Sequence, residues 1–171
     1  MLAEILLGET ANIPIQFTNA SGLAVNPDAG SIVCRVYDED GLVQNITPTK
    51  FQSGPITSAS NPSGTAIILT ADNDLTTYMR VSTSGISGHS VAGVNGDHEV
   101  VGGSATTINL STVGDGGTTG TGGTWWVTGF YKATIVATIG NGYEKGKVYT
   151  MLVTYEISST SYSEVFTFIV V

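Results

Sequence analysis

With 171 residues, the chain is long enough for one well-buried domain but short for two cores of ordinary size. Its hydrophobic content of 41% excludes a disordered chain, although only 12% of its residues are charged, about half of the usual ~25%. Acidic residues outnumber basic ones by 14 to 6, and the resulting net charge of -8 argues against nucleic acid and anionic membranes as partners.

The N-terminal stretch MLAEILLGE has no basic segment and no small-residue cleavage site. Nowhere does the chain contain an apolar run long enough to cross a bilayer. We therefore expect no signal peptide and no membrane span, and we expect synthesis in a cytoplasm. Cys34 is the only cysteine, which excludes an intrachain disulfide and favours a place in the core.

Apolar and polar residues alternate with a period of two along most of the chain, and this pattern predicts an all-β protein. The first clear strand covers residues 13 to 17, and Pro14, which lacks an amide donor, places it at a sheet edge. Residues 32 to 37 form the next strand, and the DEDG sequence at 38 to 41 provides a hairpin turn. A short strand follows at residues 66 to 70.

A glycine-rich segment occupies residues 81 to 124. Short strand-like stretches at residues 98 to 101 and 105 to 110 indicate a small hairpin within it. We expect a single domain over residues 1 to 171, with 81 to 124 as an inserted, loop-dominated excursion. Loops of this length in compact domains are usually functional or disordered.

The last third of the chain has the clearest pattern, with antiparallel strands predicted at residues 125 to 139, 147 to 157 and 163 to 171. With seven or eight short strands and no helical pattern to connect parallel ones, the sequence predicts an antiparallel β-sandwich of immunoglobulin-like or jelly-roll type. The single cysteine excludes the disulfide of antibody domains.

The stretch GDGGTTGTGGTWW, residues 114 to 126, invites comparison with phosphate-binding loops. Gly114 and Gly116 have the spacing of a dinucleotide loop, but Thr119 stands in place of its third glycine. The lysine of the other common phosphate loop is missing after Gly122, and a strand pattern follows where a helix is required. No cofactor site is therefore expected in this loop.

The two tryptophans at the end of that stretch fall on opposite faces of the predicted strand. Trp125 lies on the face expected in the core, whereas Trp126 shares an otherwise polar face with Phe130 and Val136. Because an aromatic ring can bury about 150 to 250 Å², either the glycine-rich excursion covers Trp126 or these side chains contact a neighbouring subunit. The candidate protein interface comprises Trp126, Phe130, Val136, Trp125 and the edge residue Pro14.

The two histidines offer little catalytic pattern. The sequence GHSVAG, which contains His89 and Ser90, lacks the second glycine of a hydrolase nucleophile elbow. Asp97, His98 and Glu99 are consecutive strand residues whose side chains face opposite ways, so they cannot converge on one metal without a bend. We expect a solvated loop tip there.

Two acidic stretches could offer oxygen ligands to Ca²⁺, namely DEDG at 38 to 41 and DND at 72 to 74. Neither continues into the loop of an EF-hand, and turn formation accounts for both, with a Ca²⁺ site as the weaker alternative. Few charged groups are present for acid-base chemistry, so we expect no enzyme, no catalytic residues and no metal site.

Two longer segments near the ends of the chain have a recognisable pattern, namely GETANIPIQFTNASGLAVNPDAGSIVCRVYDEDGLV and GFYKATIVATIGNGYEKGKVYTMLVTYEISSTSYSEVFTFIVV. These segments resemble small structural proteins of tailed bacteriophages. In that group a strand that begins with polar residues precedes a glycine-containing hairpin. A later strand that begins Gly-Phe-Tyr is followed by an NGYxxGxxY turn and then by the C-terminal strand. The resemblance covers about half of the chain and leaves its middle unmatched.

The resemblance implies a non-enzymatic virion protein that is made in the host bacterial cytoplasm. A capsid decoration or cement protein is expected first, and a tail, neck, baseplate or fibre component is the alternative. Its partners would be the major capsid protein or tail and neck proteins, together with copies of itself. From the residues alone, a carbohydrate-binding host-adhesion module is the rival, with Trp126 and Phe130 stacked on sugar rings.

Overall fold

The computed structural model describes residues 3–77 and 79–171, and it is almost entirely β. Strands are joined by turns and by short 3-10 helices, η1 (Ala92–Val94) and η2 (Ile139–Asn141). The prediction of an all-β protein with antiparallel sandwich character is confirmed, whereas the immunoglobulin-like or jelly-roll type stays a prediction. In the part of the chain that the structure describes, no helix is long and apolar enough to cross a membrane.

The chain forms two compact units. Unit 1 comprises Met1–Thr49 and Gly129–Val171, and unit 2 comprises Lys50–Thr128. The sequence predicts one domain with an excursion at 81 to 124, and that segment lies wholly inside unit 2. Unit 2 begins earlier and ends later than the excursion and has buried residues of its own, because short strands before residue 81 belong to its sheet.

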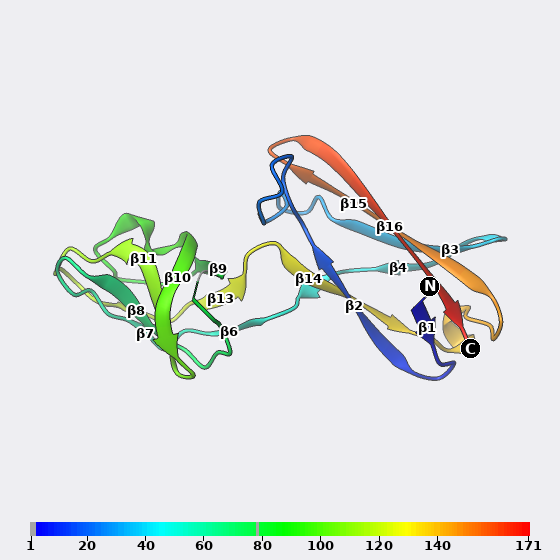
Figure 1. Ribbon diagram of the computed structural model, residues 1–171, viewed down its shortest axis with the longest axis horizontal. Coiled ribbons are helices and arrows are strands. Elements are labelled where there is room, and N and C mark those ends of the chain that lie inside the picture. Colours follow the sequence, from blue (N-terminus) through cyan, green and yellow to red (C-terminus); the bar gives the residue numbers. More distant parts are fainter. Residues whose placement is uncertain (1–2, 78) are drawn as a thin grey trace. The chain divides into compact units, whose positions relative to one another are not determined.

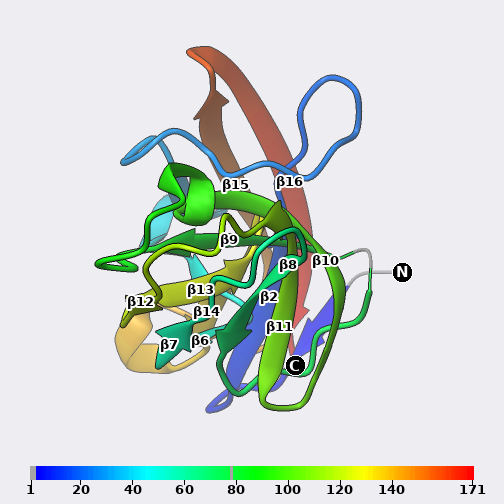
Figure 2. The ribbon, with the colours of Figure 1, turned by 90° about the vertical axis from the view of Figure 1, so that its left-hand side faces the viewer.

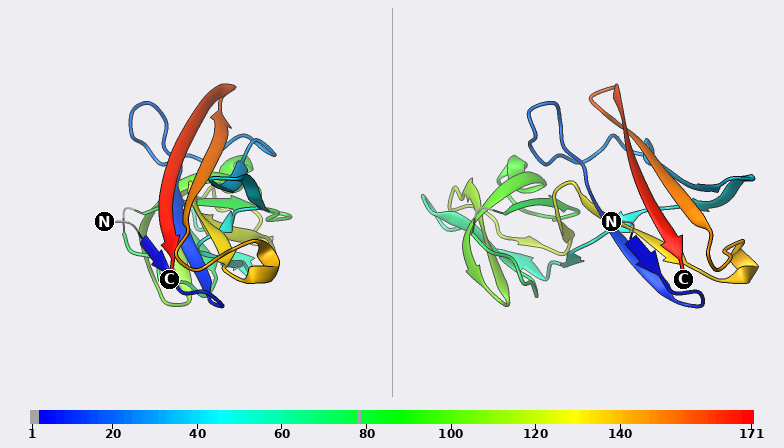
Figure 3. Two further views of the ribbon diagram at one scale, coloured as in Figure 1. Left: turned by 90° about the vertical axis from the view of Figure 1, so that its right-hand side faces the viewer. Right: turned by 45° about the vertical axis from the view of Figure 1, so that its right-hand side comes forward.

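Unit 1 is built from two sheets (Figure 1). The first has the order β1 (Ala3–Ile5), β16 (Thr160–Val170), β15 (Val148–Ile157), β3 (Val33–Asp38) and β4 (Gly41–Ile46). The second has the order β2 (Thr10–Gln16), β14 (Phe130–Val136) and β5 (Thr49–Lys50). β1 runs parallel to the last residues of β16, and Figure 3 shows the two side by side in dark blue and red.

The inner faces of these sheets supply the core of unit 1. In β2, Ile15 is buried and Pro14 is exposed, and β2 is an edge strand, as the proline predicted. Cys34 is buried, as expected. The largest fully buried side chains of this core are Phe17, Tyr143, Tyr149 and Phe168.

Unit 2 contains one antiparallel sheet that closes on itself (Figure 2). Its two outermost pairs are β12 (Gly120–Thr121) with β7 (Ser58–Ala59) and β13 (Thr124–Val127) with β6 (Ser53–Pro55). They come from the same two chain segments, because β6 leads to β7 and β12 to β13. Between those pairs the Ile56 amide donates to the Gly123 carbonyl at 2.9 Å. The strand order is β12 (Gly120–Thr121), β7 (Ser58–Ala59), β8 (Ala66–Thr70), β11 (Thr107–Val113), β10 (Gly96–Ser104), β9 (Arg80–Ser84), β13 (Thr124–Val127) and β6 (Ser53–Pro55).

The strand predicted at 125 to 139 is interrupted at Gly129, which places β13 in unit 2 and β14 in unit 1. Gly129 has φ +69°, and a Cβ atom there would lie 2.6 Å from the Val25 carbonyl oxygen and 2.7 Å from that of Phe17. Only glycine suits this turn. By alternation Ile139 shares the face of Trp125 that was expected in the core, but it is 75% exposed because it lies in η2.

Candidate functional site

The glycine-rich stretch is tied to the rest of unit 2 through Asp115. Its carboxylate accepts hydrogen bonds from the Gly117 amide at 2.8 Å, the Ser90 hydroxyl at 2.8 Å and the Asn61 side-chain amide at 2.7 Å. These bonds, with that from Gly117 first, lower the pKa of Asp115. Asn61 is only 6% exposed and also accepts a bond from the Asp115 amide. We call Asn61, Ser90 and Asp115 the loop anchor.

Close packing explains some of the glycines in this stretch. A Cβ atom on Gly114 would lie 2.2 Å from the Pro62 carbonyl oxygen. One on Gly123, which has φ +100°, would lie 2.8 Å from the carbonyl oxygen of Ser84. The glycines therefore allow the loop to lie directly against neighbouring backbone, which is a structural role.

The structure does not arrange Ser90 and His89 as a nucleophile and its base. The hydroxyl of Ser90 donates to Asp115, and His89 Nδ1 accepts a bond from the Val91 amide at 3.1 Å. The other ring nitrogen, Nε2, lies 3.3 Å from the Ser60 carbonyl oxygen. Both side chains thus participate in local structure.

His98 lies inside unit 2 rather than at the solvated loop tip expected from the sequence. It is 3% exposed, its Nδ1 lies 2.7 Å from Thr112 Oγ1, and its Nε2 lies 3.1 Å from the Val94 carbonyl oxygen. Burial lowers the pKa of this imidazole. Asp97 is exposed, as strand alternation predicts, and no group of three metal-ligating side chains occurs in residues 3–77 and 79–171.

The two tryptophans both belong to unit 2, on β13. Trp125 is 3% exposed and packs on Gly54, and its indole nitrogen has no hydrogen-bond partner among the described residues. Trp126 is half-buried, and the Lys50 ammonium lies 3.1 Å from the centroid of its ring. This cation-π contact, which no sequence motif indicated, occupies one face of Trp126.

The other three residues of the predicted interface lie in unit 1. Pro14, Phe130 and Val136 alternate along β2 and β14 on the outer face of the three-stranded sheet. Pro14 and Val136 are exposed, the latter by 37%, and Phe130 is half-buried. The five predicted residues are therefore divided, with Trp125 and Trp126 in one unit and these three in the other.

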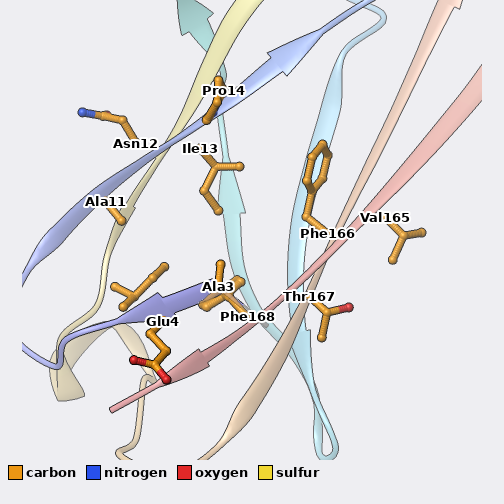
Figure 4. Close-up of a pocket in the computed structure, with 11 residues that line it drawn as sticks. Ala3, Glu4, Ala11, Asn12, Ile13, Pro14, Val165, Phe166, Thr167 and Phe168 are labelled. Carbon is orange, nitrogen blue, oxygen red and sulfur yellow. The ribbon is translucent and has the colours of Figure 1, made fainter. Parts of the chain in front are cut away.

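An apolar groove of about 530 Å³ lies in unit 1 where β1 and β16 face the edge strand β2. We call it the edge groove. Among the described residues that line it, Glu4 is the one that carries a charge. Figure 4 shows Ala11, Ile13 and Pro14 along β2 on one side, Val165, Phe166 and Thr167 along β16 on the other, and Ala3 and Glu4 of β1 at one end.

A second hollow, of about 360 Å³, lies in unit 2 and is more polar. Phe51 is 39% exposed beside it, and the Gln52 side-chain amide donates to both carboxylate oxygens of Asp74 at 3.0 Å. Asp72 and the buried Trp125 also line it. An aromatic ring beside carboxylates and amides is a chemistry that suits hydroxyl-rich ligands.

The sequence alone did not reveal either hollow. Each is formed by residues far apart in the chain, such as Ala3 with Phe168 and Phe51 with Asp72. No protein-family model, curated protein or solved structure matches this chain. The two hollows and the sequence resemblance are therefore the features of this chain that bear on its function.

Proposed function

We propose that the protein is a capsid decoration or cement protein of a tailed bacteriophage, which stabilises the particle through contacts with neighbouring subunits. The observation that carries the proposal is the open side of unit 1, where an apolar groove lies beside a sheet edge. Open edges present backbone donors and acceptors that another chain can pair with. Such a surface favours assembly over catalysis.

The sequence resemblance supports this proposal in a specific way. Both phage-like segments, residues 8 to 43 and 129 to 171, lie in unit 1, and the unmatched middle of the chain contains unit 2. The resemblance therefore follows the boundary of a compact unit. The net charge of -8 favours a place on the outside of a capsid, away from packaged DNA.

Immunogold electron microscopy tests the location. Antibodies against the purified protein would be applied to phage particles prepared from the culture that produces it. We expect label over the capsids. Label confined to tails, necks, baseplates or fibres would favour the alternative virion positions, and particles without label would refute a virion role.

Carbohydrate binding is a second candidate, because of the hollow in unit 2. Phe51 offers a partly exposed ring, and Asp72 and Asp74 offer acceptors for sugar hydroxyls. This candidate site does not include Phe130, and its acidic residues Asp72 and Asp74 were considered in the sequence only as turn residues or Ca²⁺ ligands. A glycan array would test it, with Phe51→Ala expected to abolish any signal and Val136→Ala, in unit 1, as the control that keeps it.

A further inference from the structure

We propose that the open edge of β16 accepts an extended segment of a partner virion protein as an additional β-strand, which closes the edge groove. The inference rests on the proposed assembly function and names the chemistry of the partner. Its occupant is a segment with alternating apolar side chains and a basic residue at one end.

The first observation is that β16 is paired unequally on its two sides. β15 pairs with it from Thr160 to Ile169, whereas β1 pairs only with Phe168, Ile169 and Val170. Among the described residues no other strand lies beside β16. Residues 160 to 167 therefore have a strand neighbour on one side only.

The direction of the backbone groups follows from hydrogen bonds at the end of the strand. The Val170 amide donates to the Lys147 carbonyl, on the β15 side, and the Val171 amide donates to the Ile5 carbonyl, on the β1 side. Because backbone groups alternate in direction along a strand, Thr167 and Val165 direct their amides and carbonyls toward the open side. An incoming strand would find donors and acceptors in register.

The other wall of the groove is not an equivalent acceptor. Next to β2, the Phe17 amide donates to the Gly129 carbonyl, on the β14 side. Because backbone groups alternate in direction, the backbone nitrogen and carbonyl of Pro14 face the opposite, open side. Proline has no amide hydrogen, and it blunts the edge of β2 against strand addition. The added strand therefore pairs with β16 and only packs against β2.

The groove also determines which side chains the added strand carries. Ile13 and Phe166 are half-buried on its two walls, so side chains that point inward must be apolar. Glu4 at the β1 end attracts a basic residue. A second copy of this chain is disfavoured as the occupant, because each copy carries a net charge of -8.

A synthetic peptide provides the test, with the full-length protein as the receptor. The probe has about nine residues that alternate threonine and valine, with lysine at each end, and fluorescence anisotropy measures its binding. In an antiparallel pair the threonine amides would bond to β16, and in a parallel pair the valine amides would. Two further peptides are N-methylated, one on its threonines and the other on its valines.

We expect one methylated peptide to lose affinity at least about tenfold, since several hydrogen bonds of about 0.5–1.5 kcal/mol each are removed. The other should bind within about twofold of the unmodified peptide. The peptide that fails identifies the strand direction. Any other pattern, including no binding of the unmodified peptide, overturns the proposal.

Variants of the protein provide the matched controls. Val165→Pro removes an outward amide, and Val165→Ala retains it while shortening a side chain that is 63% exposed. We expect the proline variant to bind at least about fivefold more weakly and the alanine variant to bind within about twofold of the unmodified protein. Equally weak peptide binding in both variants would contradict backbone pairing of the peptide with β16. If the proline variant does not fold, the methylated peptides decide.

Analytical ultracentrifugation of the protein without peptide tests whether a second copy of this chain occupies the edge groove. A dimer that is lost with Val165→Pro and kept with Val165→Ala would make a second copy the occupant and overturn the proposal. Peptide binding and particle labelling fail independently. Unlabelled particles would refute the virion role while the edge still binds peptide, and labelled particles without peptide binding would refute only the added strand.

Discussion

Removing the side chain of Asn61 should destabilise unit 2, because this residue holds the glycine-rich stretch in place. Its amide nitrogen lies within hydrogen-bond distance of Ser90 Oγ, Asp115 Oδ1 and the Thr118 carbonyl, which share its two N–H groups, and its oxygen accepts from the Asp115 amide. Asn61→Ala removes the two N–H donors and the oxygen acceptor together. At 6% exposure, the site gives water little room to replace them.

The expected loss in the free energy of unfolding is about 2–4 kcal/mol. Two donated bonds and one accepted bond at a net of about 0.5–1.5 kcal/mol each would give roughly 1.5–4.5 kcal/mol. The upper part of that range is reduced because the carboxylate of Asp115 is exposed and can be hydrated after the change. The loss is a large fraction of the stability of a typical domain, which is about 5–15 kcal/mol.

Urea unfolding followed by tryptophan fluorescence measures this loss. Both tryptophans, Trp125 and Trp126, lie in unit 2, so the signal reports on that unit. Asn109→Ala, which changes an amide of unit 2 that is only half-buried, is the control and should cost less than about 1 kcal/mol. A loss below about 0.5 kcal/mol for Asn61→Ala would refute the view that the loop anchor organises the stretch.

Three further predictions concern single residues. Burial lowers the pKa of His98 below its usual 6.5, so unit 2 should be most stable above that pH and lose stability as the pH falls toward about 5. The midpoints of urea unfolding, followed by tryptophan fluorescence, should show this loss. The pH dependence should be weaker in His98→Gln. Cys34 is buried, and burial raises the pKa of its thiol to about 11. A thiol reagent at about pH 8 should therefore label Cys34 only as fast as local unfolding of unit 1 exposes it. Immediate labelling would contradict this prediction. Gly129→Ala forces a Cβ atom against two carbonyl oxygens at φ +69°, and the resulting backbone strain should destabilise unit 1 by about 2–4 kcal/mol. Cys34 should then be labelled faster by the thiol reagent. An unchanged labelling rate would show that the substitution does not strain unit 1.

Strand alternation predicted much of unit 1 because its strands are half-buried and several are long. Cys34 was expected in the core, and Pro14 was expected at an edge, since both follow from local pattern and backbone chemistry. The break at Gly129 could not be predicted in the same way. Alternation continues across it, and the left-handed conformation of Gly129 depends on the distant backbone of Phe17 and Val25.

Unit 2 was harder to predict because its signals are short. Several of its strands have only two or three residues, for example Ser58–Ala59 and Gly120–Thr121, and these are too short to show a period. The contact between Lys50 and Trp126 joins residues far apart in the chain, as does the pairing of β1 with β16 that forms the edge groove. Local patterns do not encode such pairings.

The chain enters and leaves unit 2 at neighbouring positions. The Val127 amide donates to the Gln52 carbonyl at 3.0 Å, so the first and last strands of this unit form a pair. Thr49, the last residue of unit 1 before the insert, belongs to β5, which neighbours β14 within one sheet. Unit 2 is therefore inserted into unit 1 in the way that a very long hairpin loop would be. Natural recombination or a protein engineer could exchange it as a cassette, with the flanking sandwich kept intact.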